Sequence, residues 1–157
     1  MINFSVSALE KAPVKKSGIL PENFLDLAPE DQYSAAGEGS YDLTASLVSG
    51  GMLLSGKASA AVSAECGRCL NPVQITLCED DLHIFFELED GQEIVEVDED
   101  LRAELLLALP MNPLCDPECR GLCPECGCDL NRQKCRCEVK NAADKVSPWS
   151  ALDDLKL

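Results

Sequence analysis

The stretch "SYDLTASLVSGGMLLSGKASAAVSAECGRC", residues 40–69, decides the fold. Apolar residues alternate with small or polar ones on both sides of Gly50-Gly51, and this period of two is typical of strands with one buried face. Two successive glycines can supply the positive φ angles of a two-residue hairpin turn. The sequence therefore predicts an antiparallel hairpin. Its predicted inward residues are Tyr41, Leu43, Ala45, Leu47, Leu54, Ala58, Ala60, Val62 and Ala64.

Further strands are predicted on both sides of this hairpin. Residues 72–77 form a predicted strand that continues into residues 82–89, and residues 93–97 form a short one. The opening residues 2–9 are predicted as an additional strand, and the glycine-containing residues 35–40 as a loose loop. Because a helical period is almost absent up to this point, the sequence predicts a small antiparallel sheet or a partly open barrel.

The pattern changes to a helical one after the last predicted strand. The stretch "DEDLRAELLLALPM" offers Asp98 or Asp100 as an N-cap, acidic residues in the first turn and a stop at Pro110. The sequence therefore predicts a helix near 99–109 that packs on the sheet, which gives an α+β fold. Its predicted apolar residues are Leu101, Leu105, Leu106 and Leu109.

The composition of the chain changes near residue 110. Residues 1–109 hold 20 Asp or Glu against 6 Lys or Arg, a net charge of −14, whereas residues 110–157 hold 8 against 7. We therefore expect an acidic β-rich domain over 1–109 and a cysteine-rich, zinc-ribbon-like segment over 110–157, with a short helix in its last eleven residues. The acidic surface suits either a solvated face or a basic protein partner, and it repels nucleic-acid phosphate.

The cysteines indicate a reducing compartment. Seven of the ten lie in the last 43 residues, the N-terminus lacks the pattern of a signal peptide, and no stretch is apolar enough to span a membrane. A cytoplasmic location without a membrane partner is therefore expected. In that compartment a spaced cysteine array is more typical of metal binding or catalysis than of a disulfide scaffold, which stays an alternative.

The segment "GLCPECGCDLNRQKCRC", residues 121–137, has the spacing of a metal site. Cys123 and Cys126 form a two-residue knuckle, while Cys135 and Cys137 point to the same face of an extended segment. Together they make the tetrahedral thiolate set of structural zinc. An iron–sulfur centre or a redox pair is the alternative.

Two further cysteine pairs lie apart in the sequence. They are Cys66 and Cys69 in "CGRC", and Cys115 and Cys119 in "CDPEC". Neither pair closes a four-ligand shell alone, so a second zinc that joins them would explain both. The alternative for "CGRC" is a redox motif, but that motif needs a helix directly afterwards, and here β-branched residues and a proline follow.

The cysteine-rich segment has few apolar residues with which to fold. Burying one leucine contributes about 1.5–3 kcal/mol, whereas ordering the backbone of a single residue costs about 1–2 kcal/mol. Structural zinc contributes on the order of 10–16 kcal/mol and couples binding to folding, so we expect the segment to depend on it. Between residues 110 and 146 the large apolar residues are Met111, Leu114, Leu122, Leu130 and Val139.

The remaining candidate residues have simpler interpretations. Cys78 and Cys128 are interpreted as ordinary buried or free thiols, and His83, between apolar neighbours, as a packing residue. The sequence contains no phosphate-binding loop, no serine–histidine pair and no metal site with an open position. Because closed all-thiolate sites are structural, we expect a non-enzyme without a small-molecule substrate.

These motifs, in this order, resemble a known family. "CGRCL", an acidic stretch, "LRAELLLALPMNPLC", "CRGLCPECGCDLN" and "CRC" are together similar to the YceD-type proteins, also called large ribosomal RNA subunit accumulation proteins, over roughly residues 60–157. The resemblance implies a factor in ribosome biogenesis that large-subunit rRNA needs in order to accumulate, with no catalytic step. Its cysteine pattern selects the same residues as the spacing does: Cys66, Cys69, Cys115, Cys119, Cys123, Cys126, Cys135 and Cys137.

The leading hypothesis is a zinc-binding adaptor in large-subunit assembly. Its acidic domain would bind a basic ribosomal protein or a pre-large-subunit particle, and four cations would either contact rRNA phosphate or belong to a solvated loop. The alternatives are a redox- or metal-responsive cysteine protein and a nucleic-acid-binding zinc ribbon, which the net charge of −15 disfavours. The four cations are Arg132, Lys134, Arg136 and Lys140.

Overall fold

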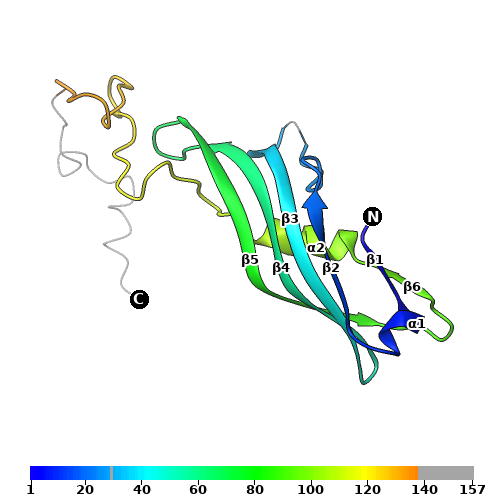
Figure 1. Ribbon diagram of the computed structural model, residues 1–157. Coiled ribbons are helices and arrows are strands. Elements are labelled where there is room, and N and C mark those ends of the chain that lie inside the picture. The colour runs from blue at the N-terminus through cyan, green and yellow to red at the C-terminus, as the bar shows by residue number, and fades with distance from the viewer. Residues whose placement is uncertain (29, 138–157) are drawn as a thin grey trace, which may run out of the picture.

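The computed structural model describes residues 1–28 and 30–137 (Figure 1). These residues form a four-stranded antiparallel sheet of order β2-β3-β4-β5, a two-stranded sheet of β1 and β6, and two short helices. Neither helix has the length and hydropathy that crossing a bilayer requires. The elements are β1 (Asn3–Ser5), α1 (Val6–Leu9), β2 (Val14–Leu20), β3 (Tyr33–Val48), β4 (Gly51–Glu65), β5 (Pro72–Glu87), β6 (Ile94–Glu96) and α2 (Asp98–Leu107).

The predicted antiparallel sheet with a packed helix is confirmed. Helix α2 crosses one face of the four-stranded sheet (Figure 1). The zinc-ribbon-like character of the tail and the division of the chain at 109/110 stay predictions, and the short helix expected over 147–157 lies outside the described residues.

The hairpin of β3 and β4 forms the centre of the sheet. Val48 pairs with Gly51, so the connecting turn is Ser49-Gly50 and not the predicted Gly50-Gly51. Gly50 has a φ of 90°, which glycine adopts without steric cost. Gly51 begins β4, where a Cβ atom would collide with the carbonyl oxygen of Phe86 on β5.

The buried face of the sheet follows the predicted alternation closely. Leu101 and Leu105 of α2 are fully buried and belong to the same core. Two of the predicted inward residues differ, because Tyr41 is half-buried and Leu47, near the hairpin tip, is exposed. The buried hydrophobic residues of the hairpin are Tyr33, Leu43, Ala45, Met52, Leu54, Ala58, Ala60, Val62 and Ala64.

The start of α2 differs from the prediction. Its N-cap residue is Val97, which makes no side-chain cap hydrogen bond, and not Asp98 or Asp100. The carboxylate of Asp98 instead accepts the backbone N–H of Ile2, with distances of 3.1 and 2.9 Å to its two oxygens. The acid therefore ties the N-terminus of the chain to the helix, while still placing negative charge where the helix dipole favours it.

Two further local predictions are wrong. The predicted strand over 2–9 is a strand only in β1 and then turns into α1, because β6 offers just three residues for pairing. The predicted loop over 35–40 belongs to β3. Register shifts between Ala35 and Gly37 and between Gly37 and Ser40 accommodate this stretch, in the way that β-bulges accept extra residues within a strand.

Replacing Leu101 with alanine should destabilise the protein strongly. The side chain is fully buried, so its truncation leaves a cavity, and we expect the free energy of unfolding to fall by about 2–5 kcal/mol. Leu107 lies on the same helix and is 79% exposed, so Leu107→Ala should change stability by less than about 0.5 kcal/mol. Chemical denaturation followed by circular dichroism measures both variants. Equal losses would contradict the packing of α2.

Candidate metal centre

The described part of the cysteine-rich segment, residues 110–137, lies at the end of the sheet where β4 passes into β5 (Figure 1). The loop between these strands carries the first cysteine pair, and the chain returns to it after α2. The backbone N–H of Gly67 donates to the Pro113 carbonyl oxygen at 2.8 Å, and that of Leu122 donates to the Arg68 carbonyl oxygen at 3.1 Å. Backbone hydrogen bonds therefore hold the two distant segments together.

Four cysteines from these two segments form the first cluster: Cys66, Cys69, Cys115 and Cys119. Their sulfur atoms all lie within 4.8 Å of one another, and the set joins residues on both sides of the predicted boundary at 109/110. Cys66 Sγ lies 3.9 Å from Cys119 Sγ, and Cys69 Sγ lies 3.6 Å from Cys115 Sγ. All members except Cys115 are buried. The Arg68 guanidinium donates to the Cys119 carbonyl oxygen at 2.9 Å, a contact that was not predicted from the sequence.

The other four predicted ligands form the second cluster: Cys123, Cys126, Cys135 and Cys137. Their sulfur atoms also lie within 4.8 Å of one another. The Sγ atom of Cys135 is 3.3 Å from that of Cys123 and 3.6 Å from that of Cys126. Only Cys123 is buried, so the second cluster is closer to solvent than the first.

The sulfur spacing fits one tetrahedral ion in each cluster. Four thiolates at the usual zinc–sulfur distance of ~2.3 Å stand about 3.8 Å apart, and the sulfur contacts given above run from 3.3 to 3.9 Å. A disulfide would bring two sulfurs to ~2.05 Å, and none of the ten cysteines, all of which are described, forms one. Each cluster can therefore hold a metal ion.

The two Cys-x-x-Cys turns, Cys66 to Cys69 and Cys123 to Cys126, share one backbone geometry. The N–H of Leu70 donates to the Cys66 carbonyl oxygen at 2.9 Å, and the N–H of Gly127 donates to the Cys123 carbonyl oxygen at the same distance. Leu70 and Gly127 have φ angles of 59° and 68°. Glycine takes this left-handed conformation freely, whereas another residue pays about 1–2 kcal/mol. The strained backbone of Leu70 ends the turn that brings the thiols of Cys66 and Cys69 close together.

Crowding separates the pKa values of the thiols in the first cluster. The backbone N–H of Cys115 is the main cause that lowers the pKa of Cys66 to about 6. The neighbouring thiols of Cys69 and Cys119 raise the pKa of Cys115 to about 12. Because like charges repel at this distance, four such sulfurs do not all ionise without a cation among them. Binding of a metal ion in this cluster would therefore release protons.

Cys128 lies beside the second cluster without being one of its four members. Its carbonyl oxygen accepts the backbone N–H of Cys123 at 2.8 Å, and its own backbone N–H is the main cause that lowers the pKa of Cys126 to about 6. The Cys126 thiol in turn raises the pKa of Cys128 to about 12. The half-buried Cys128 side chain is thus a close neighbour of the cluster.

Two asparagines donate hydrogen bonds to sulfurs of the first cluster. Asn71 Nδ2 lies 3.2 Å from Cys69 Sγ, and Asn131 Nδ2 lies 3.3 Å from Cys119 Sγ. The carboxylate of Asp129 accepts from both amides, at 3.1 Å and 2.9 Å. The backbone N–H of Asn131 and the Asn71 amide hold the pKa of Asp129 below its usual range. None of these three residues was predicted from the sequence, although Leu-Asn ends both "CGRCLN" and "CGCDLN".

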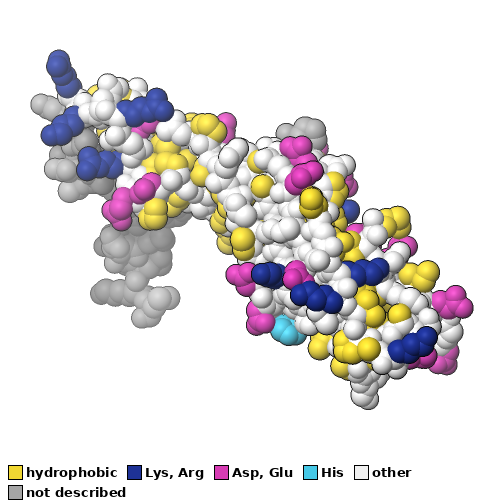
Figure 2. Space-filling model, in the orientation of Figure 1, with side chains coloured by type: hydrophobic (Ala, Val, Ile, Leu, Met, Phe, Trp, Pro, Cys, Tyr) yellow, Lys and Arg dark blue, Asp and Glu magenta, His cyan; other side chains and the backbone are white. Residues whose placement is uncertain are grey.

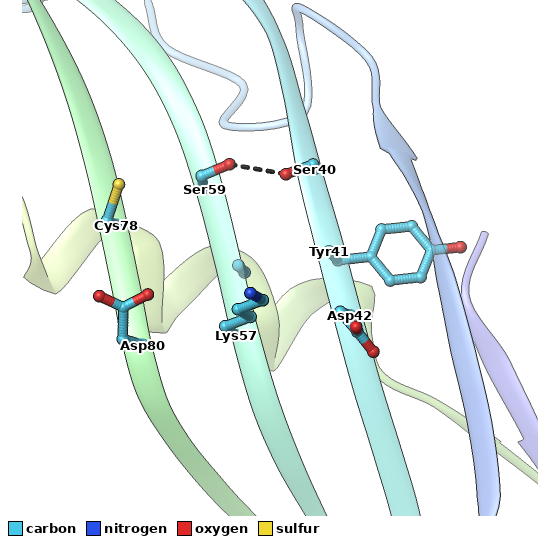
Figure 3. Close-up of a pocket in the computed structure, with 8 residues that line it drawn as sticks. Ser40, Tyr41, Asp42, Lys57, Ser59, Cys78 and Asp80 are labelled. Atoms are coloured by element: carbon cyan, nitrogen blue, oxygen red, sulfur yellow. Dashed lines mark hydrogen bonds between the residues drawn. The ribbon is translucent and has the colours of Figure 1, made fainter.

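The face of the sheet opposite α2 carries a separate polar hollow of about 250 Å³ (Figure 3). The hydroxyls of Ser40 and Ser59 lie 2.9 Å apart in it, and the exposed Cys78 lines it from β5. His83, predicted as a packing residue, is instead exposed on the same strand, which corrects that prediction. Neither Cys78 nor His83 belongs to a cysteine cluster. The charged residues of the hollow are Asp42, Lys57 and Asp80.

Three of the four predicted rRNA-contacting cations lie near the second cluster in sequence and are exposed. They are Arg132, Lys134 and Arg136. Figure 2 shows Lys and Arg side chains gathered at the cysteine-rich end of the molecule. Arg132 is also paired with Asp129, with 3.5 Å between Nε and Oδ2. Lys140 lies outside the described residues.

The sequence profile described as "Large ribosomal RNA subunit accumulation protein YceD" matches residues 54–156. The chain belongs to the YceD family. The match begins within β4 and contains all eight cysteines of the two clusters, so the resemblance noted from the motifs is confirmed. No solved structure matches the chain.

Several curated proteins are similar to this YceD-family chain. An uncharacterized protein of Mycobacterium tuberculosis is 37% identical over 108 residues, which cover 57% of this chain and 50% of the relative. An uncharacterized protein of Mycobacterium leprae is 30% identical over 124 residues, which cover 70% of this chain and 55% of the relative. "Large ribosomal RNA subunit accumulation protein YCED homolog 1, chloroplastic" of Arabidopsis thaliana is 32% identical over 59 residues, which cover 38% of this chain and 17% of the relative. The chain spans about half the length of these mycobacterial relatives.

Proposed function

We propose that this chain is a non-catalytic, zinc-binding factor in the biogenesis of the large ribosomal subunit, which supports the accumulation of large-subunit rRNA. The observation that carries the proposal is the YceD match over residues 54–156, because this span includes every cysteine of both clusters. The Arabidopsis relative is named as a homolog of a large ribosomal RNA subunit accumulation protein, which supports the same role.

Zinc is the metal that suits these clusters best. An all-sulfur donor set with contacts near those of a zinc tetrathiolate favours zinc over the hard cations, which prefer oxygen ligands. When bound, zinc would supply a structural cross-link and no open coordination position, which supports a non-catalytic role without a small-molecule substrate. The proposed ligands are Cys66, Cys69, Cys115 and Cys119 for one ion, and Cys123, Cys126, Cys135 and Cys137 for the other.

The charge distribution supports a ribosomal partner in the cytoplasm. Residues 1–109 carry a net charge of −14, which attracts a basic ribosomal protein by long-range steering. The exposed Arg132, Lys134 and Arg136 offer phosphate contacts at the cysteine-rich end. The chain would thus bind a pre-large-subunit particle through a basic protein, with rRNA contact at its basic end. Ten thiols without a disulfide suit a reducing compartment.

Affinity capture of pre-large-subunit particles tests this function. A tagged full-length chain should recover large-subunit proteins and rRNA precursors from cells of its own source at low salt. A variant with Arg132, Lys134 and Arg136 all changed to glutamate should recover less rRNA with a smaller salt dependence, because phosphate contacts weaken as salt rises. A charge-matched variant with Lys11, Lys15 and Lys57 all changed to glutamate, at exposed positions of the acidic domain, serves as the control. Recovery of no ribosomal material by the wild type would contradict the proposal.

The exposure of Cys115 and Cys126 favours a redox- or metal-responsive protein as the second candidate. Exposed thiols near other thiols are accessible to oxidants and to exchange with other metal ligands. A filled structural cage should protect its thiols from alkylation until chelator is added. A responsive set should form disulfides under mild oxidant while the metal is still present, which distinguishes the two candidates.

A further inference from the structure

A carboxylate and two amides connect the two cysteine clusters. Asp129 belongs to the eight-residue loop that the second cluster closes. One of its carboxylate oxygens accepts Asn71 Nδ2 at 3.1 Å, and the other accepts Asn131 Nδ2 at 2.9 Å. Each of these amide nitrogens also donates to a sulfur of the first cluster. Asp129, which the second cluster positions, therefore holds the amides of Asn71 and Asn131 against the sulfurs of the first cluster.

The carboxylate decides which end of each amide faces a sulfur. A side-chain amide has two N–H donors on nitrogen and acceptor lone pairs on oxygen. Asn71 uses one N–H for Asp129 and the other for Cys69 Sγ. The reversed amide would turn its oxygen toward both a carboxylate and a thiolate, which repel it. Asp129 therefore keeps the donors pointed at the sulfurs, and donors of this kind stabilise the anionic thiolate that binds metal.

The loop that carries Asp129 is folded back onto the chain that leaves the first cluster. The N–H of Leu130 donates to the Gly121 carbonyl oxygen at 2.9 Å, and Leu122 forms a β-bridge with Asp129. The second cluster fixes both ends of this loop, between Cys126 and Cys135. Opening that cluster frees the loop ends and increases the entropy lost when Asp129 docks.

We infer that the Asn71–Asp129–Asn131 network couples the two metal sites, so that an ion in the second cluster raises the affinity of the first cluster for its ion. This inference rests on the metal binding proposed above. The coupling is reciprocal by thermodynamic linkage. Loss of a hydrogen-bond partner behind a metal ligand typically lowers metal affinity about 10–100-fold, and we expect Asp129→Asn to lower first-cluster affinity by this factor.

Metal titration of the stripped full-length chain measures the coupling. Cadmium NMR gives each tetrathiolate site its own resonance, and competition with a chelator converts site filling into affinity. The double variant Cys135→Ser/Cys137→Ser removes the second site and should lower first-cluster affinity about 10–100-fold. Adding Asp129→Asn to this double variant should lower it no further, because the coupling is already lost. Such non-additivity is the signature of two changes in one network.

A charge-matched control separates this coupling from general electrostatics. Glu125→Gln removes one negative charge from an exposed position in the second knuckle, outside the amide network, and should leave first-cluster affinity unchanged. If the chain binds two ions, but neither Asp129→Asn nor the loss of the second site changes the affinity of the first cluster, the coupling is wrong and the proposed metal binding stands. Failure of both clusters to bind zinc, cadmium or cobalt would overturn the proposed metal binding together with the coupling.

Discussion

Chelation of the metal should unfold the cysteine-rich segment while the sheet stays folded. Among the described residues, the core around the first cluster consists of Cys66, Cys69 and Cys119, with only Leu114 and Leu122 packed against it. Structural zinc contributes on the order of 10–16 kcal/mol in small domains, far more than two half-buried leucines provide. The sheet has its own core, centred on β3, β4 and α2 and separate from that of the first cluster, so we expect it to stay folded without the ion.

Amide NMR spectra with and without chelator measure this selective unfolding. Signals from the segment after α2 should collapse to the narrow range of an unfolded chain, whereas those of β3 and β4 should keep their dispersion. Zinc added back in excess of the chelator should restore the lost signals, which controls for damage during stripping. A stripped chain whose segment 110–137 keeps its dispersed signals would show that the ions are not what orders it.

The sheet was predictable where side-chain polarity follows burial, and unpredictable elsewhere. On β4 the burial alternates from Ala58 to Ala64, and each predicted inward residue of the strand is buried. Strand β2 was missed because two inward positions hold Lys16 and Gly18. The Lys16 ammonium lies 5.1 Å from the Phe4 ring centroid, and Gly18 leaves room for the Tyr41 ring. Both positions are set by partners distant in sequence, so no local period reveals them.

The grouping of the eight cysteines into two clusters could be predicted because a four-thiolate shell leaves few ways to group them. Two-residue knuckles impose their spacing locally, and the unpaired knuckle at Cys66 had to meet another pair. The network of Asn71, Asp129 and Asn131 could not be predicted in this way. Asparagine and aspartate are common in turns for local reasons, and only the folded chain shows that these amides face sulfurs.

Replacing Cys66 should remove one of the two ions while replacing Cys128 removes none. Cys66 is fully buried in the first cluster, so Cys66→Ala deletes one of four thiolates without opening a place for another ligand. If four ligands share about 10–16 kcal/mol equally, losing one costs roughly 2.5–4 kcal/mol, and the affinity falls by about two to three orders of magnitude. Dialysis against a competing chelator followed by elemental analysis should then find one zinc per chain.

Cys128→Ala is the matched control, because this thiol lies next to the second cluster but outside its four members. The variant should keep two ions per chain under the same dialysis, since alanine preserves the backbone carbonyl that accepts the Cys123 N–H. One ion lost from Cys128→Ala would make Cys128 a ligand and displace a member of the second cluster. Two ions retained by Cys66→Ala would mean that the first cluster binds metal through other groups, or that the second ion sits elsewhere.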